Sequence, residues 1–312
     1  MSTHAFAALQ AFLLKSSGLS LDKEKLYLVE ARLTPVIQQA GLSGLPDLVA
    51  RLDADKGLAK KVTEAMTVNE TFFFRDRLPF EGFRTAALPA LLKARAQNRR
   101  LRIWSAACST GQEPYSLAMI LDEEARALTG WSVDIVATDI AETVLKRAKE
   151  GVYTHFEVQR GVPMPHLVRY FTKRRDQWAV NPTIKGRIDF RQQNLMSDFS
   201  HLGQFDVIFC RNVLIYFAPD QKRDVLARIA QRLAPDGYLV LGAAESVIGY
   251  SNEFKPHPDN RIVLTRRGAP EPAAVSALPP LTSRLAQLPA PAAAVALERF
   301  RTASLGQARE TK

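Results

Sequence analysis

The sequence reads Leu101-Arg-Ile-Trp-Ser-Ala106 and then Ala107-Cys-Ser-Thr-Gly-Gln-Glu-Pro114 in the part of the chain where the architecture is clearest. The first run is short and apolar and ends in small side chains, which is typical of a buried strand. A helical pattern follows from Glu113 to Leu128, and it tolerates Pro114 because the first helical turn needs no proline N–H. A strand that turns tightly into a helix is the repeating unit of an α/β sheet.

The alternation of strand and helix continues toward the C-terminus. Further strands are expected at 133–139, 187–192, 205–210, 238–242 and 261–266, with helices at 141–149 and 219–233. This alternation predicts a doubly wound, mostly parallel sheet. A charged stretch at about 152–186 interrupts it and is too long for a plain loop, so it is interpreted as an inserted subdomain with one helix and a short β-ribbon.

The two ends of the chain have different patterns. Apolar residues between Ala5 and Leu13 and between Leu26 and Ile37 recur at helical spacing, and no strand pattern precedes Leu101. The C-terminal stretch is rich in Ala and Pro, which predicts a flexible tail with a docking peptide at 295–305. The expected organisation is an all-α N-terminal domain at 1–75, an α/β domain at 76–267 with the insertion at 152–186, and the tail at 268–312.

Charge and cysteine content restrict the class of protein. The 42 Lys and Arg residues against 32 Asp and Glu suggest an acidic partner, which could be nucleic acid, an anionic membrane or an acidic protein. Cys108 and Cys210 lie in apolar runs and are expected to be buried, reduced thiols. The five His are scattered, so no metal site is expected. No apolar run approaches the ~20 residues of a membrane span, and we expect a cytoplasmic protein without direct membrane insertion.

Polar residues follow four of the predicted strands, at Ser109, Asp139, Asn194 and Arg211-Asn212. Because parallel strands end at one edge of a sheet, these residues are expected to form one binding site. No G-x-G-x-x-G or G-x-x-x-x-G-K-[ST] motif is present, so a nucleoside ligand without pyrophosphate is favoured, and S-adenosylmethionine is the commonest such cofactor. For Asp139, a bond to the ribose hydroxyls and an N-cap of the next helix are equally compatible with the sequence.

The segment Asn69-Glu-Thr-Phe-Phe-Phe-Arg75 precedes the α/β pattern. Three consecutive Phe cannot all face one way on a helix. They could pack between domains beside a cleft, or they could form a hydrophobic hinge with incidental polar flanks. On the residues alone, the hinge is the favoured interpretation.

Four motifs together give a specific resemblance: Asn69 to Arg75, Ser105-Ala-Ala-Cys-Ser-Thr-Gly-Gln-Glu-Pro-Tyr-Ser116, Ala137-Thr-Asp-Ile140 and Phe209-Cys-Arg-Asn-Val-Leu-Ile-Tyr-Phe217. Over residues 5–267 the chain resembles the CheR chemoreceptor methyltransferases. The resemblance implies an all-α N-terminal domain and a Rossmann-like methyltransferase sheet with a small inserted β-subdomain. It also implies methyl transfer from S-adenosyl-L-methionine to receptor glutamates, which forms methyl esters and S-adenosyl-L-homocysteine in sensory adaptation.

The resemblance also implies site residues and partners. The cofactor contacts would be Asn69, Thr71, Arg75, Glu113, Asp139, Asn194, Leu195, Arg211 and Asn212, while Arg75 and Tyr216 take positions associated with catalysis. The implied partner is the cytoplasmic domain of chemoreceptors (methyl-accepting chemotaxis proteins), and we expect a monomer that uses no metal and binds no nucleic acid.

Two other functions are compatible with the sequence. A nucleic-acid methyltransferase is disfavoured because Cys210-Arg-Asn-Val213 stands where base-methylating enzymes commonly carry (Asp/Asn)-Pro-Pro-aromatic. A non-catalytic cofactor-binding signalling module is disfavoured by the presence of Arg75 and Tyr216.

Basic residues are concentrated just before and within the first strand of the sheet. The stretch from Arg75 to Arg102 has eight of them and two acids, Asp76 and Glu81; the basic residues are Arg75, Arg77, Arg84, Lys93, Arg95, Arg99, Arg100 and Arg102. The interpretation without a function is a solvated helix face. The favoured interpretation is a surface beside Arg75 on which an acidic receptor docks.

Overall fold

The N-terminal part of the molecule is built only from helices. The computed structural model describes residues 3–258 and 260–269, so the expected docking peptide and almost all of the expected tail lie outside the described residues. Helices α1 (Thr3–Ser17), α2 (Leu26–Gln39), α3 (Leu45–Arg51) and α4 (Lys56–Met66), with a short 3₁₀ turn at Lys23–Lys25, share one apolar core. Leu9, Leu13 and Val62 are fully buried in it. The helical spacing of the apolar residues predicts this packing correctly.

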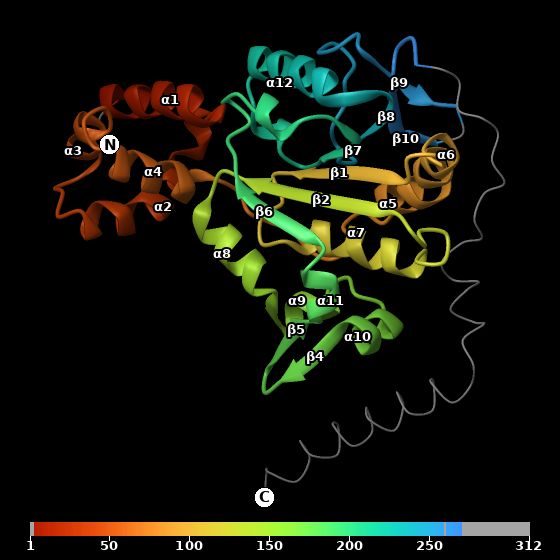
Figure 1. Ribbon diagram of the computed structural model, residues 1–312. Helices are drawn as coiled ribbons and strands as arrows, with labels where there is room; N and C mark the ends of the chain where they lie inside the picture. Colours follow the sequence, from red (N-terminus) through yellow and green to blue (C-terminus); the bar gives the residue numbers. More distant parts are fainter. Residues whose placement is uncertain (1–2, 259, 270–312) are drawn as a thin grey trace, which may run out of the picture.

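A seven-stranded sheet forms the centre of the molecule, in the order β6-β2-β1-β7-β8-β10-β9 (Figure 1). Its strands are β1 (Arg100–Ala106), β2 (Ser132–Asp139), β6 (Ile188–Gln192), β7 (Phe205–Cys210), β8 (Leu233–Leu241), β9 (Phe254–His257) and β10 (Asn260–Arg266). The strands from β6 to β8 are parallel, and β10 and β9 add antiparallel pairs. The predicted doubly wound α/β class is confirmed.

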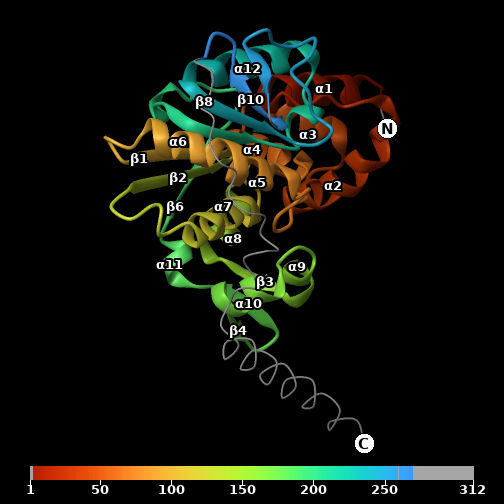
Figure 2. The same cartoon turned by 90° about the vertical axis from the view of Figure 1, so that its right-hand side faces the viewer.

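Helices cover both faces of the sheet (Figures 1 and 2). One face holds α7 (Gln112–Glu123), α8 (Glu142–Glu150), and a continuous helical run made of α5 (Leu78–Gly82), a π-helical turn (Phe83–Ala87) and α6 (Leu88–Ala94). The other face holds α12 (Pro219–Arg232). Strand β1 serves both cores, because Ile103 packs with the first group and Trp104 with the second. Helix α7 ends earlier than its predicted boundary at Leu128.

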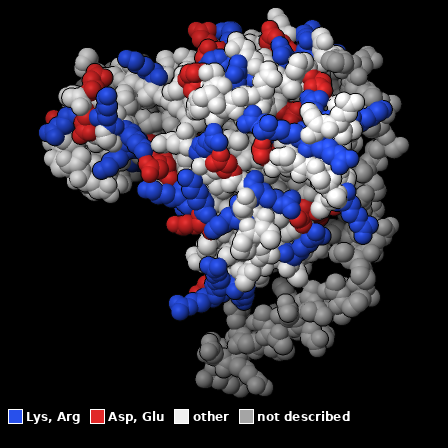
Figure 3. All heavy atoms as spheres, viewed as in Figure 1, with Lys and Arg blue, Asp and Glu red and all other residues white. Residues whose placement is uncertain are grey.

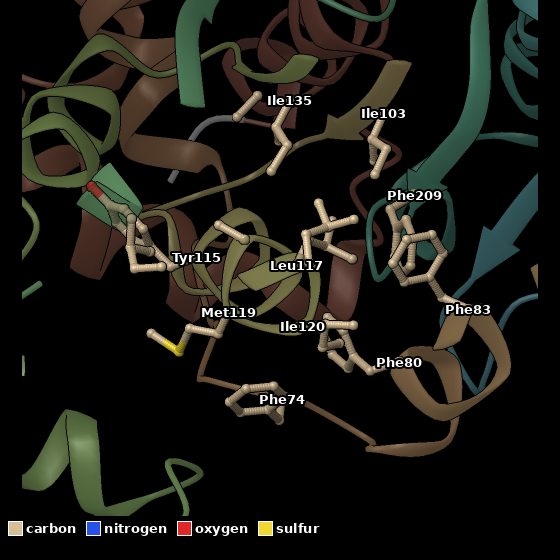
Figure 4. Packing of buried hydrophobic residues seen from close by; sticks show 14 of the residues in the cluster. Phe74, Phe80, Phe83, Ile103, Tyr115, Leu117, Met119, Ile120, Ile135 and Phe209 are labelled. Atoms are coloured by element: carbon tan, nitrogen blue, oxygen red, sulfur yellow. The ribbon is translucent and has the colours of Figure 1, made fainter. Parts of the chain in front are cut away.

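The core on the first face is dense in aromatic and branched side chains (Figure 4). Leu117 and Ile120 of α7 are fully buried, and so is Phe209 of β7. The Phe209 ring contacts Phe80 and Phe83, each with ring centroids 5.8 Å apart. This packing fixes the strand ends, which carry the polar residues singled out in the sequence.

The inserted subdomain (152–186) lies beside the main sheet (Figure 1). It contains β3 (Val152–Thr154), α9 (His155–Gln159), α10 (Met164–Tyr170), β4 (Phe171–Arg174), β5 (Gln177–Val180) and α11 (Pro182–Lys185), with an antiparallel sheet in the order β3-β5-β4. The expected inserted β-subdomain is present, but it contains three helices and a three-stranded sheet instead of one helix and a short β-ribbon. A third strand pairs because the chain extends immediately after α8.

The triple-Phe segment joins the inserted subdomain to the main core. Phe73 is fully buried, and its ring makes T-shaped contacts with the rings of Tyr153 and Phe171, with ring centroids 5.0 Å and 5.4 Å apart. Phe74 is 7% exposed, and its ring stacks on that of His166 with the ring centroids 5.2 Å apart. The hinge interpretation is wrong for these two residues, which are core residues, whereas Phe72 is only half-buried.

The N-terminal helices rest on the carboxyl edge of the sheet. The Ser20 N–H donates to the Tyr216 carbonyl at 2.8 Å, and the Asn194 amide donates to the Ser16 carbonyl at 2.7 Å. Glu64 of α4 accepts the Glu142 N–H at the start of α8, at 2.9 Å. Within the described residues, no helix is long and apolar enough to span a bilayer.

Candidate functional site

A pocket lies at the carboxyl ends of β1, β2 and β7, where the N-terminal helices meet the sheet. It encloses about 950 Å³ of space between its walls, a volume that includes open solvent at its mouth. The structure brings all ten residues predicted from the resemblance to its wall: Asn69, Thr71, Arg75, Glu113, Asp139, Asn194, Leu195, Arg211, Asn212 and Tyr216. The pocket also lies at the switch point of the sheet, because β2 pairs with one edge of β1 and β7 with the other. Ligands of open parallel sheets bind at such a switch point.

Asp139 ends β2 and is 5% exposed. One carboxylate oxygen accepts the Ala141 N–H at 2.9 Å, and the other accepts the Ser109 N–H at 2.8 Å. Burial raises the pKa of Asp139, although these donated bonds act in the opposite direction. Asp139 is not the N-cap of α8, because that helix begins at Glu142 after Ala141. Each oxygen retains a lone pair, so the carboxylate can still accept two ligand hydroxyls.

The loop after β1 has a strained backbone. Ala107 and Ser109 adopt left-handed φ values of 61° and 50°, which side-chain-bearing residues rarely adopt. The Ser109 hydroxyl donates to the Asn69 carbonyl at 2.8 Å, so the loop is tied to the segment that carries Arg75. Small side chains let the loop main chain approach the pocket closely, and strain of this kind is typical of functional sites.

Glu113 and Arg211 form a buried ion pair between β1, α7 and β7. The Arg211 guanidinium lies 2.9 Å from a Glu113 carboxylate oxygen and 2.9 Å from Asp76, and it also donates to the Arg75 carbonyl at 2.7 Å. The other oxygen of Glu113 accepts the Ser105 hydroxyl at 2.7 Å. Burial raises the pKa of Glu113, and Arg211 opposes that shift. The pair fixes the floor of the pocket and leaves Arg211 little freedom to move.

Arg75 differs from Arg211 in how its guanidinium is bound. Among the described residues it makes no ion pair, and one guanidinium N–H donates to the Glu70 carbonyl at 2.6 Å. The guanidinium lies 5.6 Å from the centre of the Phe72 ring. Arg75 therefore has N–H donors at the pocket that are available to an incoming anion.

The remaining predicted residues form the other walls. The Asn194 amide is already occupied, since it donates to Ser16 and accepts the Met196 N–H at 2.9 Å. Leu195 gives a buried apolar wall. Asn212 has a left-handed φ of 57°, and Tyr216 is half-buried beside it in the pocket.

Glu245 is a site-shaping residue that the sequence analysis missed. Its carboxylate accepts the N–H groups of Asn212 at 2.6 Å, Val213 at 2.9 Å, Leu214 at 2.7 Å and Gly242 at 2.8 Å. It thereby fixes the loop that carries Asn212 and Tyr216. The available signal was its place after the strand that ends at Leu241, because every other strand of the parallel group is followed by a polar site residue.

We expect Glu245→Gln to weaken both folding and binding. An amide would turn an N–H donor toward the loop N–H groups, so about 1–3 kcal/mol of stability should be lost. Affinity for S-adenosylhomocysteine, the product that the resemblance implies for this pocket, should fall about tenfold, because the loop that lines the pocket loosens. Thermal unfolding and calorimetry measure the two effects. Glu253→Gln, on the same segment but with an exposed side chain, is the matched control and should change neither.

The basic stretch before β1 does not form one docking surface beside Arg75, so that prediction is wrong. Arg84 is 1% exposed, and Arg95 is engaged by Asp206 and Asp236 at 2.9 and 2.6 Å. Arg99 and Arg100 lie at the start of β1, at the opposite end of that strand from the pocket. In the view of Figure 3, basic side chains are spread over the surface with acidic ones among them.

Two expectations concern cysteines and metals. Cys108 and Cys210 are free and buried, as predicted. Among residues 3–258 and 260–269, no group of three or more His, Cys, Asp or Glu side chains is placed to hold a metal ion.

The chain matches known families and relatives over most of its length. Residues 4–67 match the model described as CheR methyltransferase, all-alpha domain, and residues 69–263 match CheR methyltransferase, SAM binding domain. Chemotaxis protein methyltransferase 1 of Pseudomonas aeruginosa is 47% identical over 255 residues, covering 80% of this chain and 93% of the relative. Chemotaxis protein methyltransferase Cher2 of Pseudomonas putida is 43% identical over 256 residues, with the same coverage. The chain belongs to the CheR methyltransferase family.

Proposed function

We propose that this protein transfers a methyl group from S-adenosylmethionine to glutamate carboxylates of chemoreceptors, in the cytoplasm, for sensory adaptation. Membership of the family makes the chain an S-adenosylmethionine-dependent methyltransferase. The names of its relatives favour a role in chemotaxis. The observation that carries the substrate class is Arg75, a pocket guanidinium without a carboxylate partner among the described residues.

The pocket residues fit the cofactor chemically. Asp139 would accept the ribose hydroxyls, and the apolar Ile140 and Leu195 beside it would flank the adenine. The loop after β1, with its small side chains, would pass close to the cofactor. Glu113 would hold the amino-acid portion of the cofactor from the floor of the pocket. These assignments follow from the donors and acceptors at each wall and are proposals for this chain.

The reaction requires alignment rather than proton transfer. A glutamate side chain titrates near ~4.3 and is already a carboxylate at neutral pH, so the nucleophile needs no general base. When bound, S-adenosylmethionine supplies an electrophilic methyl group whose C–S bond breaks, leaving the electron pair on sulfur, as the carboxylate oxygen forms the new O–C bond. The task left to the protein is to hold the carboxylate in line and to exclude water.

Arg75 and Tyr216 are suited to that task. The planar guanidinium of Arg75 can bind a carboxylate through two N–H groups and so fix the direction of its oxygens. Leu19, Val213 and Phe217 lie with Tyr216 in the pocket wall and restrict access of water. Charge is neutralised as the methyl group moves, so a partly apolar cleft favours the transition state over the separated ions.

A transfer assay with tritiated S-adenosylmethionine tests the proposal. The full chain is incubated with a receptor cytoplasmic domain, with DNA, with RNA and with no acceptor. We expect label only on the receptor, released as methanol in mild base because the product is a methyl ester. Base-stable label, or label on nucleic acid, would contradict the proposed substrate. Cofactor binding without any transfer would favour the signalling-module alternative.

A further inference from the structure

Arg160 brings the inserted subdomain into contact with the segment that carries Arg75. It follows α9, is 42% exposed on its side chain, and donates to the Glu70 carboxylate at 2.6 Å. Its guanidinium lies 4.3 Å from the centre of the Phe72 ring, over which Arg75 also lies. The next residue, Gly161, permits this close approach, since a Cβ there would stand 1.9 Å from the Phe73 carbonyl oxygen.

Glu70 contacts both arginines but through different atoms. Its carboxylate accepts from Arg160, whereas its main-chain carbonyl accepts from Arg75 at 2.6 Å. The hydrogen bond from Arg160, and after it the charge of Arg75, hold the pKa of the Glu70 carboxyl below its usual range. Arg75 bonds the main-chain carbonyl of this same residue and lies over the same Phe72 ring as Arg160, so the Glu70 carboxylate is a rival partner for its guanidinium.

We propose that Arg160 is a positioning residue for methyl transfer: by engaging the Glu70 carboxylate, it keeps that carboxylate from pairing with Arg75. Arg75 then stays available for the substrate carboxylate. The inference rests on the proposed function of Arg75. It assigns to the inserted subdomain a role in the reaction itself, exerted through Glu70 and Phe72.

The proposal predicts a specific pattern among three variants. Arg160→Ala should lower kcat about tenfold, because the freed Glu70 carboxylate pairs with Arg75 and an ion pair and a cation–π contact are lost. The double variant Arg160→Ala with Glu70→Gln should regain most of the lost kcat, because a neutral amide does not compete for Arg75. Glu70→Gln alone should be impaired less than Arg160→Ala.

A matched control separates positioning from subdomain stability. Arg169 belongs to the same subdomain, pairs with Asp122 at 2.8 Å and lies 5.1 Å from the centre of the Tyr170 ring, but it is outside the pocket wall. Arg169→Ala should resemble Arg160→Ala in its effect on thermal stability and leave kcat unchanged. If the double variant is no faster than Arg160→Ala, or if Arg169→Ala slows transfer equally, the proposal is wrong.

An NMR measurement tests the same proposal without depending on turnover. The ¹⁵N Nε–Hε resonance of Arg75, assigned by its loss in Arg75→Lys, should shift in Arg160→Ala and return toward its wild-type position in the double variant. An unmoved resonance in Arg160→Ala would overturn the proposal. Because this measurement needs no receptor, failure of the wild-type protein to methylate receptors would contradict the proposed function alone.

Discussion

Arg75→Ala is expected to lower kcat for receptor methylation about 100-fold or more, since a donor aimed at a reacting oxygen typically contributes ~10²–10³ in rate. The side chain contributes little to the core, because Arg75 is half-buried and makes no ion pair among the described residues. Thermal unfolding should therefore change little. The measurement is the initial rate of ester formation at saturating cofactor and receptor.

Arg75→Lys distinguishes geometry from charge. An ammonium supplies the charge but not the planar pair of donors, so rescue should remain below about one-tenth of the wild-type kcat. Full activity of the lysine variant would show that charge alone suffices, and wild-type activity of the alanine variant would remove Arg75 from the reaction. Arg223→Ala, an exposed arginine paired with Asp220 on α12, is the control for loss of one basic side chain.

The sequence predicted the central parallel strands β1, β2, β7 and β8 because most of their residues are buried and form largely apolar runs. It missed β9, whose Lys255 and Pro256 break such a pattern. Pro256 is tolerated because β9 is the edge strand of the sheet. The helical run from Leu78 to Ala94 was also missed. Its two early prolines, Pro79 and Pro89, resemble breaks in sequence but stand in the first turns of α5 and α6.

The partners and the exposure of the charged residues could not be predicted from the sequence pattern in the same way. The partners of Arg95 are Asp206 and Asp236, more than a hundred residues away in sequence, so its exposure depends on the tertiary fold. Glu245 lies likewise in a loop without periodicity, and only the fold brings it to the 212–215 amides. The polar residues that follow the strands lie together in one pocket wall, because parallel strands end at one edge and the sequence pattern predicts that topology.

Asp139→Ala is expected to weaken S-adenosylhomocysteine binding about 100-fold, which corresponds to ~3 kcal/mol for two charge-assisted bonds of ~1.5 kcal/mol each. The Ser109 and Ala141 N–H groups also lose their acceptor, so the loop after β1 should loosen and thermal stability should fall. Isothermal calorimetry on the folded variant measures the affinity. Unchanged affinity would remove Asp139 from the ribose site and leave it only the role of holding these two N–H groups.

The pH dependence of binding gives a second test of Asp139. Burial raises its pKa, so as pH falls the carboxylate should become protonated at a higher pH than an exposed aspartate would. Protonation removes the negative charge that strengthens the ribose bonds, and wild-type affinity should therefore decrease as pH falls through that raised pKa. Asp139→Ala should show a smaller decrease over the same range, because the titrating acceptor is absent. An equal decrease in both proteins would assign the effect to another group, of which buried Glu113, whose pKa is also raised, is the first to examine.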